Sequence, residues 1–406
     1  MQSLRLPRLL LLSTLLLITL LATTSGASAS SVTTHSDTGT SSSTVTSPQA
    51  QVNWVQLRYD PQHTGLNPFE KILSPANVGR LQVAWTAATG TTVNSFPVTS
   101  SPAVVNGVVY VGSDDNRLYA FNAQTGATLW SAATNSLVDS SPAVANGIVY
   151  VGSFDGNVYA FNARTGTQLW TATTGAFVSS SPTVVNGVVF VGSEDENLYA
   201  FNAQTGATLW STATGNGITS SPAVDNGVVF VGVGDNLAAF NAQTGVQLWS
   251  TATRGTIYSS PAVASGVVYI GSDDKYLYAF NAQTGAKLWS APAGSYVHSA
   301  PAVAGGKVFV GSYDNHVYAF NAHTGTQIWS APTGAYVYSS PAVANGVVYV
   351  GSTDDNVYAF NAQTGAKLWS AKTGSFIYSS PAVANGVVYI GSNDGKLYAY
   401  ALPPKA

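Results

Sequence analysis

The sequence has no cysteine among its 406 residues and only one methionine. Without cysteine it can form no disulfide framework, zinc–thiolate site, catalytic thiol or lipid-anchored cysteine. Charged residues are scarce too, at 8% of the chain against about 25% in ordinary globular proteins. The net charge of −3 argues against a basic surface for nucleic acid. A hydrophobic fraction of 45% still predicts a folded chain with a large core.

The N-terminus has the pattern of a secretion signal over residues 1–29. Arg5 and Arg8 precede an apolar run at 9–22, and Ala27-Ser28-Ala29 is typical of a cleavage site. The apolar run is short for a membrane span, so we expect cleavage and no span afterwards, with an uncleaved anchor as the alternative. The sequence therefore predicts a secreted or cell-surface protein.

Residues 30–50 are mostly Ser and Thr and almost devoid of apolar side chains. Such a segment cannot bury enough surface to offset the entropy of ordering it. We interpret it as a flexible linker, followed by a lead-in segment at 51–80 and a single folded domain at 81–406.

From residue 100 the chain repeats the pattern SSPAVVNGVVYVGSDDNRLYAFNAQTGATLW with small variations. The repeats are 40 residues apart, with one interval of 39. Eight prolines mark the eight copies: Pro102, Pro142, Pro182, Pro222, Pro261, Pro301, Pro341 and Pro381. A period of this length indicates a solenoid or a propeller.

Each copy favours strands over helices, because Gly, Pro, Val, Tyr and Phe recur in it. In the first copy the predicted strands are 100–104, 108–113, 118–123 and a short one that ends at Trp130. Turns are expected at Asn-Gly, at the Asp-rich stretch and at Gln-Thr-Gly. Four strands in about 40 residues are typical of a β-propeller blade.

The outermost strand shows how the ring closes. Seven copies end in Leu-Trp or Ile-Trp, whereas the eighth stops at LYAYALPPKA. A matching strand lies upstream at 81–87, around Trp85, and we expect it to pair with 396–401. The predicted fold is all-β: an eight-bladed propeller of four-stranded blades, closed by an N-terminal strand that completes the last blade. We interpret the tryptophans as packing between blades rather than as a sugar-stacking platform: Trp85, Trp130, Trp170, Trp210, Trp249, Trp289, Trp329 and Trp369.

An aspartate also recurs in every copy. Calcium would accept such oxygens, but recurrence in each blade favours a structural role in the turn between the second and third strands. The series is Asp115, Asp155, Asp195, Asp235, Asp274, Asp314, Asp354 and Asp394. Two histidines of the sixth copy, His298 and His316, could form a metal pair. Without a third ligand we expect two exposed surface residues and no metal site.

The copies differ most at the position three residues before each proline. It holds Thr99, Asp139, Ser179 and Thr219 in the first half of the ring, and Tyr258, His298, Tyr338 and Tyr378 in the second. Tyr296 and Tyr336 lie two residues further back. These positions enter the innermost strand, so we predict an aromatic crescent at the mouth of the central channel. Drift after duplication, with the rings merely covering neighbouring blades, is the alternative.

The repeat GS-x-D-x-x-LYAFNAQTG-x-x-LW resembles that of the pyrroloquinoline-quinone (PQQ)-type propellers over residues 81–402. It lacks the Gly-His and Trp-Asp marks of WD-type propellers, and residues 54–81 resemble the lead-in of secreted bacterial members. That family includes quinone-dependent alcohol dehydrogenases, an outer-membrane barrel-assembly lipoprotein and secreted propellers of unknown role.

The resemblance implies a fold rather than a cofactor. The dehydrogenases carry an adjacent-cysteine disulfide and long insertions with a catalytic Asp and calcium ligands. This chain has no cysteine, and its inter-blade loops are short. We therefore expect no catalytic residues, no PQQ and no other cofactor.

The predicted function is a monomeric, secreted or cell-surface module that binds or scaffolds protein or glycan partners. A quinone-dependent dehydrogenase and a purely structural repeat protein are the alternatives.

Overall fold

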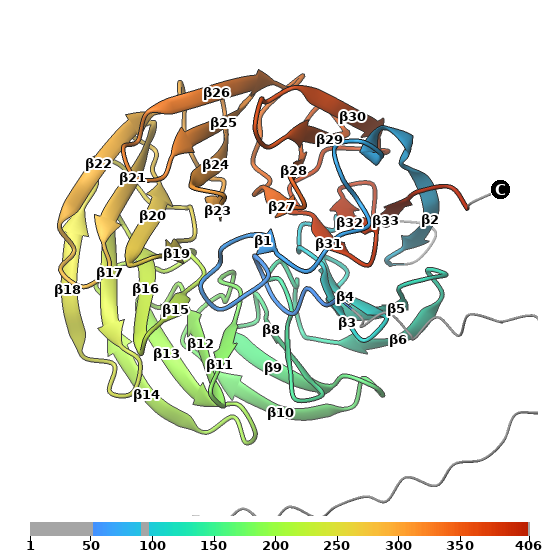
Figure 1. Cartoon of the computed structure of the whole chain (residues 1–406). Helices are drawn as coiled ribbons and strands as arrows, with labels where there is room; N and C mark the ends of the chain where they lie inside the picture. The colour runs from blue at the N-terminus through green and yellow to red at the C-terminus, as the bar shows by residue number, and fades with distance from the viewer. Residues whose placement is uncertain (1–51, 91–96, 405–406) are drawn as a thin grey trace, which may run out of the picture. The chain divides into compact units, whose positions relative to one another are not determined.

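The structure is a computed structural model that describes residues 52–90 and 97–404. The signal and linker predicted at 1–29 and 30–50 lie outside the described residues. The described residues form one compact unit, in which eight four-stranded blades stand around a central axis (Figure 1), and the sheet of one blade gains a fifth strand, β1 (Leu66–Asn67). This confirms the predicted all-β, eight-bladed propeller.

Every blade presents a short innermost strand to the axis. These strands are β3 (Ala103–Val105), β7 (Ala143–Ala145), β11 (Thr183–Val185), β15 (Ala223–Asp225), β19 (Ala262–Ala264), β23 (Ala302–Ala304), β27 (Ala342–Ala344) and β31 (Ala382–Ala384). The second strands are β4 (Val108–Ser113), β8 (Ile148–Gly152), β12 (Val188–Gly192), β16 (Val228–Val233), β20 (Val267–Gly271), β24 (Lys307–Ser312), β28 (Val347–Gly351) and β32 (Val387–Ser392).

The third and fourth strands complete each blade outward. The third strands are β5 (Arg117–Asn122), β9 (Asn157–Asn162), β13 (Asn197–Asn202), β17 (Asn236–Asn241), β21 (Tyr276–Asn281), β25 (His316–Asn321), β29 (Asn356–Asn361) and β33 (Lys396–Ala401). The fourth strands are β6 (Thr128–Ala133), β10 (Gln168–Thr173), β14 (Thr208–Ala213), β18 (Gln247–Ala252), β22 (Lys287–Pro292), β26 (Gln327–Pro332), β30 (Lys367–Lys372) and β2 (Gln82–Ala88).

The ring closes as predicted, because β2 pairs antiparallel with β33 and supplies the missing fourth strand of blade 8. Two strand boundaries differ from the prediction by more than one residue. The innermost strand begins at Ala103 rather than at Ser100, because Pro102 has no N–H and the N–H of Ser101 bonds to the next blade. The outermost strand continues to Ala133, because its pairing resumes beyond an irregularity next to Trp130.

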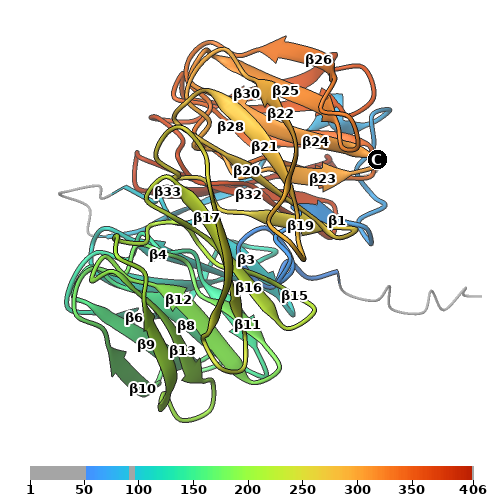
Figure 2. The ribbon, with the colours of Figure 1, turned by 90° about the vertical axis from the view of Figure 1, so that its left-hand side faces the viewer.

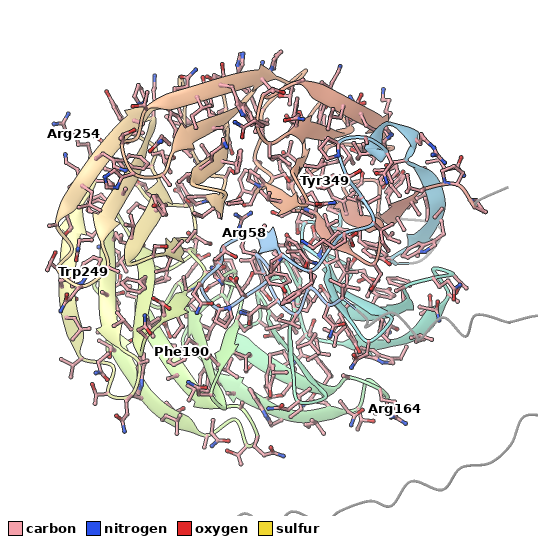
Figure 3. The ribbon with its side chains drawn as sticks, viewed as in Figure 1. Arg58, Arg164, Phe190, Trp249, Arg254 and Tyr349 are labelled. Carbon is pink, nitrogen blue, oxygen red and sulfur yellow. The ribbon has the colours of Figure 1, made fainter. Side chains whose placement is uncertain are left out.

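The core lies between neighbouring blades. The second and third strands bury nearly all their side chains, including Tyr150, Phe190 and Phe240, because each sheet is covered on both sides. Apart from β2, the outer strands are joined to the third strands by tight turns, and most of them leave the leucine or isoleucine before the tryptophan about half exposed. Figure 3 shows Phe190 between sheets and Trp249 at the outer wall.

The lead-in segment, which the sequence left without a structural role, crosses one end of the central channel. Figure 2 shows it, together with β1 (Leu66–Asn67), on one side of the ring. It contacts all eight innermost strands at the equivalent valine. In blade 1, Trp54 exchanges two backbone bonds with Val104, and in blade 8 Asn67 Nδ2 donates to Val383 O. In the six blades between them the valine N–H donates to the segment: Val144 to Val55 O, Val184 to Gln56 Oε1, Val224 to Pro61 O, Val263 to Gln62 O, Val303 to Thr64 O and Val343 to Gly65 O.

One buried cation holds the middle of the lead-in segment in place. Arg58 lies on the axis (Figure 3), where its guanidinium donates to the carbonyl oxygens of Pro301 and Pro341. Burial lowers its pKa to about 9, although Asp60 opposes this shift. Gly65 is required beside it, because a Cβ there would lie 2.5 Å from Arg58 Nη2. After Glu70 the segment leaves the axis, and the short 3₁₀ helix η1 (Val78–Arg80) leads into β2.

Within the described ranges, η1 is the only helix, and it is neither long nor apolar enough to span a membrane.

Candidate functional site

The end of the channel opposite the lead-in segment opens into a hollow of about 500 Å³. Its walls come from the loops that precede the innermost strands and from the loops between second and third strands. The lining residues are Thr99, Asp139, Ser179, Glu194, Thr219, Tyr258, Tyr313, Tyr338 and Tyr378. We call this hollow the channel mouth. Beneath it lies a smaller hollow of about 130 Å³, with Leu57 of the lead-in segment among its lining residues.

The structure brings the predicted crescent together at this mouth. Tyr258 and Tyr338 are 47% and 40% exposed, and Tyr378 is half buried. The rings of Tyr338 and Tyr378 meet edge to face with centroids 5.3 Å apart. Tyr296 and Tyr336 do not line the mouth; they lie behind it, where Tyr336 stacks on Tyr313 at 5.2 Å.

His298 is not the exposed surface residue that the sequence predicted. Its side chain is only 15% exposed, and its Nε2 lies 2.6 Å from Asp273 Oδ1. Because a carboxylate only accepts, Nε2 carries the proton and Nδ1 accepts from the Tyr313 hydroxyl at 3.0 Å. Burial lowers the pKa of His298, although Asp273 opposes the shift, so the imidazole is neutral at pH 7. His316 has separate partners in its own turn, with Nδ1 3.0 Å from Asp314 O.

The other half of the mouth is acidic. Asp139 accepts from the hydroxyl of Thr99 at 2.8 Å, and Glu194 accepts from Ser179 at 3.3 Å. Asp114 lies beside Asp139, and burial together with that carboxyl raises the pKa of Asp114 to about 8. The two carboxyl groups therefore share one proton at neutral pH.

Sequence reasoning missed Asp114, Glu194, Asp273 and Tyr313, which all occupy the variable position of GS-x-D. The sequence did contain a signal for them, because this position varies between copies as strongly as the position three residues before each proline. It lies in the turn between the second and third strands, which emerges at the same end of the ring.

The recurring aspartates occupy the turns for which they were predicted. Asp155 accepts from the N–H of Asn157 at 2.9 Å and from the hydroxyl of Tyr159 at 2.7 Å. The same aspartate–tyrosine bond recurs in every blade except blade 4, where Ala238 replaces the tyrosine and Asp235 accepts from Asn236. Within the described ranges, no group of three His, Asp or Glu residues is arranged to hold a metal.

The recurring tryptophans bridge neighbouring blades. Trp130 Nε1, for example, donates to Ala163 O of the next blade at 3.1 Å, and its ring covers Gly166 so closely that a Cβ there would lie 2.7 Å away. Equivalent indole bonds are made by Trp85, Trp170, Trp210, Trp249, Trp289, Trp329 and Trp369.

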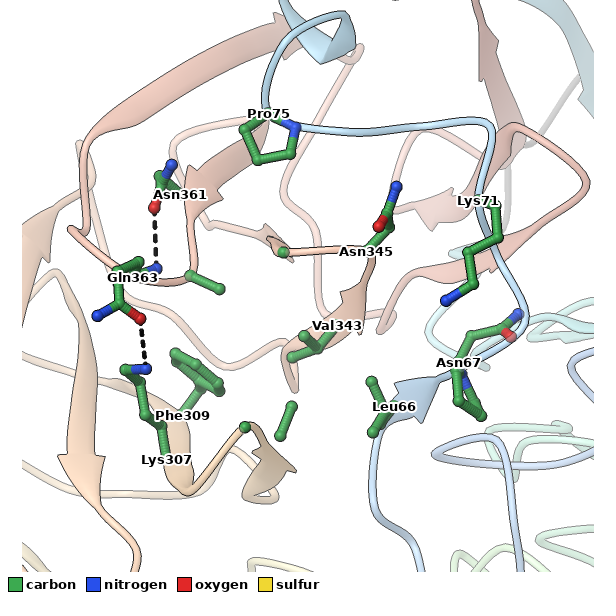
Figure 4. A pocket seen from close by; sticks show the side chains of 15 residues that line it. Leu66, Asn67, Lys71, Pro75, Lys307, Phe309, Val343, Asn345, Asn361 and Gln363 are labelled. Atoms are coloured by element: carbon green, nitrogen blue, oxygen red, sulfur yellow. Dashed lines mark hydrogen bonds between the residues drawn. The ribbon is translucent and has the colours of Figure 1, made fainter.

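Other hollows lie between blades at the end of the lead-in segment. Figure 4 shows one of about 490 Å³, in which Lys307 Nζ donates to Gln363 Oε1 at 2.7 Å. Hollows with equivalent residues recur at two other blade boundaries, where Tyr110 and Phe190 correspond to Phe309. Their recurrence indicates that blade geometry produces them. The lining of the channel mouth, by contrast, changes around the ring, from threonine, serine and acidic residues on one side to tyrosines on the other.

These features define a closed eight-bladed β-propeller with a chemically asymmetric channel mouth. A family model described as outer membrane protein assembly factor BamB matches residues 78–193, 154–256, 238–341 and 334–402. The chain belongs to this family.

Solved structures show the same fold at low sequence identity. BamB from Moraxella catarrhalis is 19% identical, with a TM-score of 0.68 over 79% of this chain and 99% of BamB. A europium-containing methanol dehydrogenase is 16% identical, with a TM-score of 0.74 over 86% of this chain and 98% of the dehydrogenase. The designed protein Ika8 is 20% identical, with a TM-score of 0.70 over 79% of this chain and 99% of Ika8. A search of curated protein sequences finds no match.

Proposed function

We propose that the protein is a non-enzymatic binding module of the cell envelope or cell exterior, which holds a protein or glycan partner at the channel mouth. The observation that carries this proposal is the break in symmetry. Every blade has the same packing to satisfy, yet the side chains that differ most between blades converge on one hollow. Its volume of about 500 Å³ is within the usual range for binding sites.

The family supports a binding role and an envelope location. The matching family model bears the name of an outer membrane protein assembly factor, and BamB itself shares the fold. The N-terminal signal pattern, with Arg5, Arg8 and Ala27-Ser28-Ala29, is consistent with export.

The mouth does not fit the quinone cofactor of the dehydrogenases that share the fold. PQQ is an anion that carries carboxylate groups, whereas the lining includes Asp139 and Glu194 and neither lysine nor arginine. Bringing these charges together would be unfavourable in a partly buried site. We therefore assign no catalytic step and no cofactor to this chain.

Two assays test the proposal. Capture from the secreted and envelope fractions, together with a glycan array, identifies a partner with the full folded domain as bait. Tyr338→Ala combined with Tyr378→Ala should weaken that binding at least tenfold. Phe69→Ala, an exposed aromatic of the lead-in segment at the other end, is the matched control and should not.

The dehydrogenase alternative is tested separately. With PQQ and calcium supplied, the protein should not reduce a dye with alcohols or sugars. Turnover with a stoichiometric quinone absorbance would overturn the proposal. If a partner binds the double tyrosine variant as tightly as the unchanged chain, the channel mouth is not its binding site.

A further inference from the structure

The channel mouth has two chemically different walls. Blades 1–3 supply Asp139 and Glu194, with Asp114 behind them, whereas blades 5–8 supply tyrosines. The walls face one hollow, and the negative charge of Asp139 is close enough to contribute to raising the pKa of Tyr338. A ligand in the hollow would therefore meet carboxylates and aromatic faces together.

The acidic wall has negative charge that the described residues leave without a cation. Neither lysine nor arginine lines the hollow, and Asp114 Oδ1 is buried without a hydrogen-bond partner. Asp139 accepts from the hydroxyl of Thr99 and from the proton that it shares with Asp114. Carboxylates withdrawn from solvent are usually paired with a cation or fully hydrogen-bonded. The partly buried pair keeps one negative charge, which no lysine or arginine of the lining offsets.

The aromatic wall is held in place from behind. His298 packs against Tyr258 with centroids 4.9 Å apart and meets Tyr338 edge to face. Bonds to Asp273 and Tyr313 fix the imidazole, and its lowered pKa keeps it uncharged at pH 7. The wall thus offers preorganised rings without a positive charge that would repel a cation.

We propose that the channel mouth binds an organic cation, namely an ammonium group carried by a small molecule or by a lysine side chain of the partner. This inference rests on the proposed binding function and names the chemistry of its ligand. Aromatic faces attract ammonium groups through the ring quadrupole, and the carboxyl pair supplies the opposite charge. A neutral sugar could stack on the tyrosines but would leave that charge uncompensated, and an anion would be repelled.

A charge-only comparison tests the inference on the intact domain. Choline and 3,3-dimethylbutan-1-ol have the same shape, but only choline is charged. We expect choline to bind about tenfold more tightly by calorimetric or NMR titration, and this preference should shrink as salt is raised. Equal binding of the two compounds, or binding of neither choline nor the lysine peptide described below, would overturn the inference.

Variants then assign the preference to each wall. Asp114→Asn with Asp139→Asn should reduce the preference for choline severalfold, and adding Glu194→Gln should abolish it. Both Asn changes are needed, because Asp114 would otherwise ionise when Asp139 is neutralised. Tyr338→Leu should reduce choline binding severalfold while keeping an apolar contact. Phe69→Ala should change neither. An undiminished preference in the double Asn variant would contradict the role of the carboxyl pair, and a preference that survives the triple variant would contradict the inference.

A second arm separates the two sources of the ammonium group. A peptide with one lysine is compared with the same peptide carrying acetyl-lysine, which is uncharged. Binding of the lysine peptide without choline binding would assign the site to a protein partner, and the reverse would assign it to a small molecule. If a captured partner depends on Tyr338 and Tyr378 but has no charge preference, the proposed function stands and this inference fails.

Discussion

The indole of each outer-strand tryptophan is held by the next blade as well as by its own. Trp289 donates from Nε1 to Ala322 O at 3.1 Å and covers Gly325 so closely that a Cβ there would overlap the ring. Each tryptophan therefore contributes to the boundary between two sheets, and its loss leaves a cavity there.

Trp289→Ala should lower the free energy of unfolding by about 3–5 kcal/mol, as expected for a large aromatic at a packed position. Tyr338→Ala with Tyr378→Ala should lower it by about 1 kcal/mol or less, because Tyr338 is exposed and Tyr378 is half buried. Denaturant unfolding of the three proteins measures both values. A larger loss in the tyrosine variant than in the tryptophan variant would show that the crescent is packing.

Asp114 makes the stability of the fold depend on pH. Burial first, and then Asp139, raises its pKa to about 8 from an ordinary value of 3.8. The folded state therefore holds its proton more tightly than the unfolded state. Its contribution to stability is fully present below about pH 4 and is lost as pH rises through 8.

Asp114→Asn should accordingly stabilise the protein more at pH 9 than at pH 5. The charged groups that face Asp114 are Asp139 and Asp115. Because the carboxyl is only partly buried, solvent screens the pair, and we expect a difference of no more than about 2 kcal/mol. Melting temperatures of the two proteins across this range measure it, and a constant difference would contradict the raised pKa.

At the scale of elements, two N-terminal segments complete the ring in different ways. The strand β2 closes the edge of blade 8 through its pairing with β33, whereas the lead-in segment satisfies backbone groups at the innermost strands. Because the lead-in segment directly precedes β2 in the chain, a shorter truncation removes the lead-in segment alone and a longer one removes both.

A chain that starts at residue 90 should aggregate, because removal of β2 exposes the edge of β33. A chain that starts at residue 81 keeps β2 and should stay monomeric, but it should melt at a lower temperature because Trp54 and Leu73 leave the core. Size-exclusion chromatography and thermal unfolding test both. An unchanged melting temperature and monomeric elution for the shorter chain would refute closure by β2.

The blades and their closure could be predicted because each structural requirement is written eight times. The lead-in segment could not, because it occurs once and most of its bonds to the ring use backbone groups, which leave no side-chain pattern. At the mouth, the variable position three residues before each proline identified Tyr258, Tyr338 and Tyr378. The sequence also singled out Asp139 at that position, but the rest of the acidic wall was missed, because Asp114 and Glu194 follow a glycine-serine pair that otherwise signals only a turn.

At the scale of the whole molecule, a ring of hydrogen bonds encircles the channel beneath the mouth. The N–H of one residue in each blade donates to the serine Oγ of the next, as from Ser101 to Ser141 at 2.9 Å. Seven such bonds are present. The ring is interrupted at Ser260, because Ala300 stands where the next hydroxyl would be.

Ala300→Ser should complete this ring and stabilise the protein by about 0.5–1.5 kcal/mol, the usual net contribution of a hydrogen bond. Ala300 lines the small hollow of about 130 Å³ beneath the mouth, so the hydroxyl has room. Ala302→Ser, at a fully buried position in the same blade, is the control and should destabilise the protein. A loss of stability in Ala300→Ser as well would show that the gap has no spare space.

The lead-in segment has a consequence for the number of repeats. Nearly identical tandem repeats are prone to gain or lose a unit. In a ring held together only by contacts between neighbouring blades, no single contact would depend on the total number of blades. Here a single stretch from Trp54 to Asn67 contacts all eight innermost strands in order. In a ring of seven or nine blades, the bonding groups of this segment would no longer line up with the innermost strands. The segment therefore ties the stability of the folded chain to the number of repeats that the chain contains.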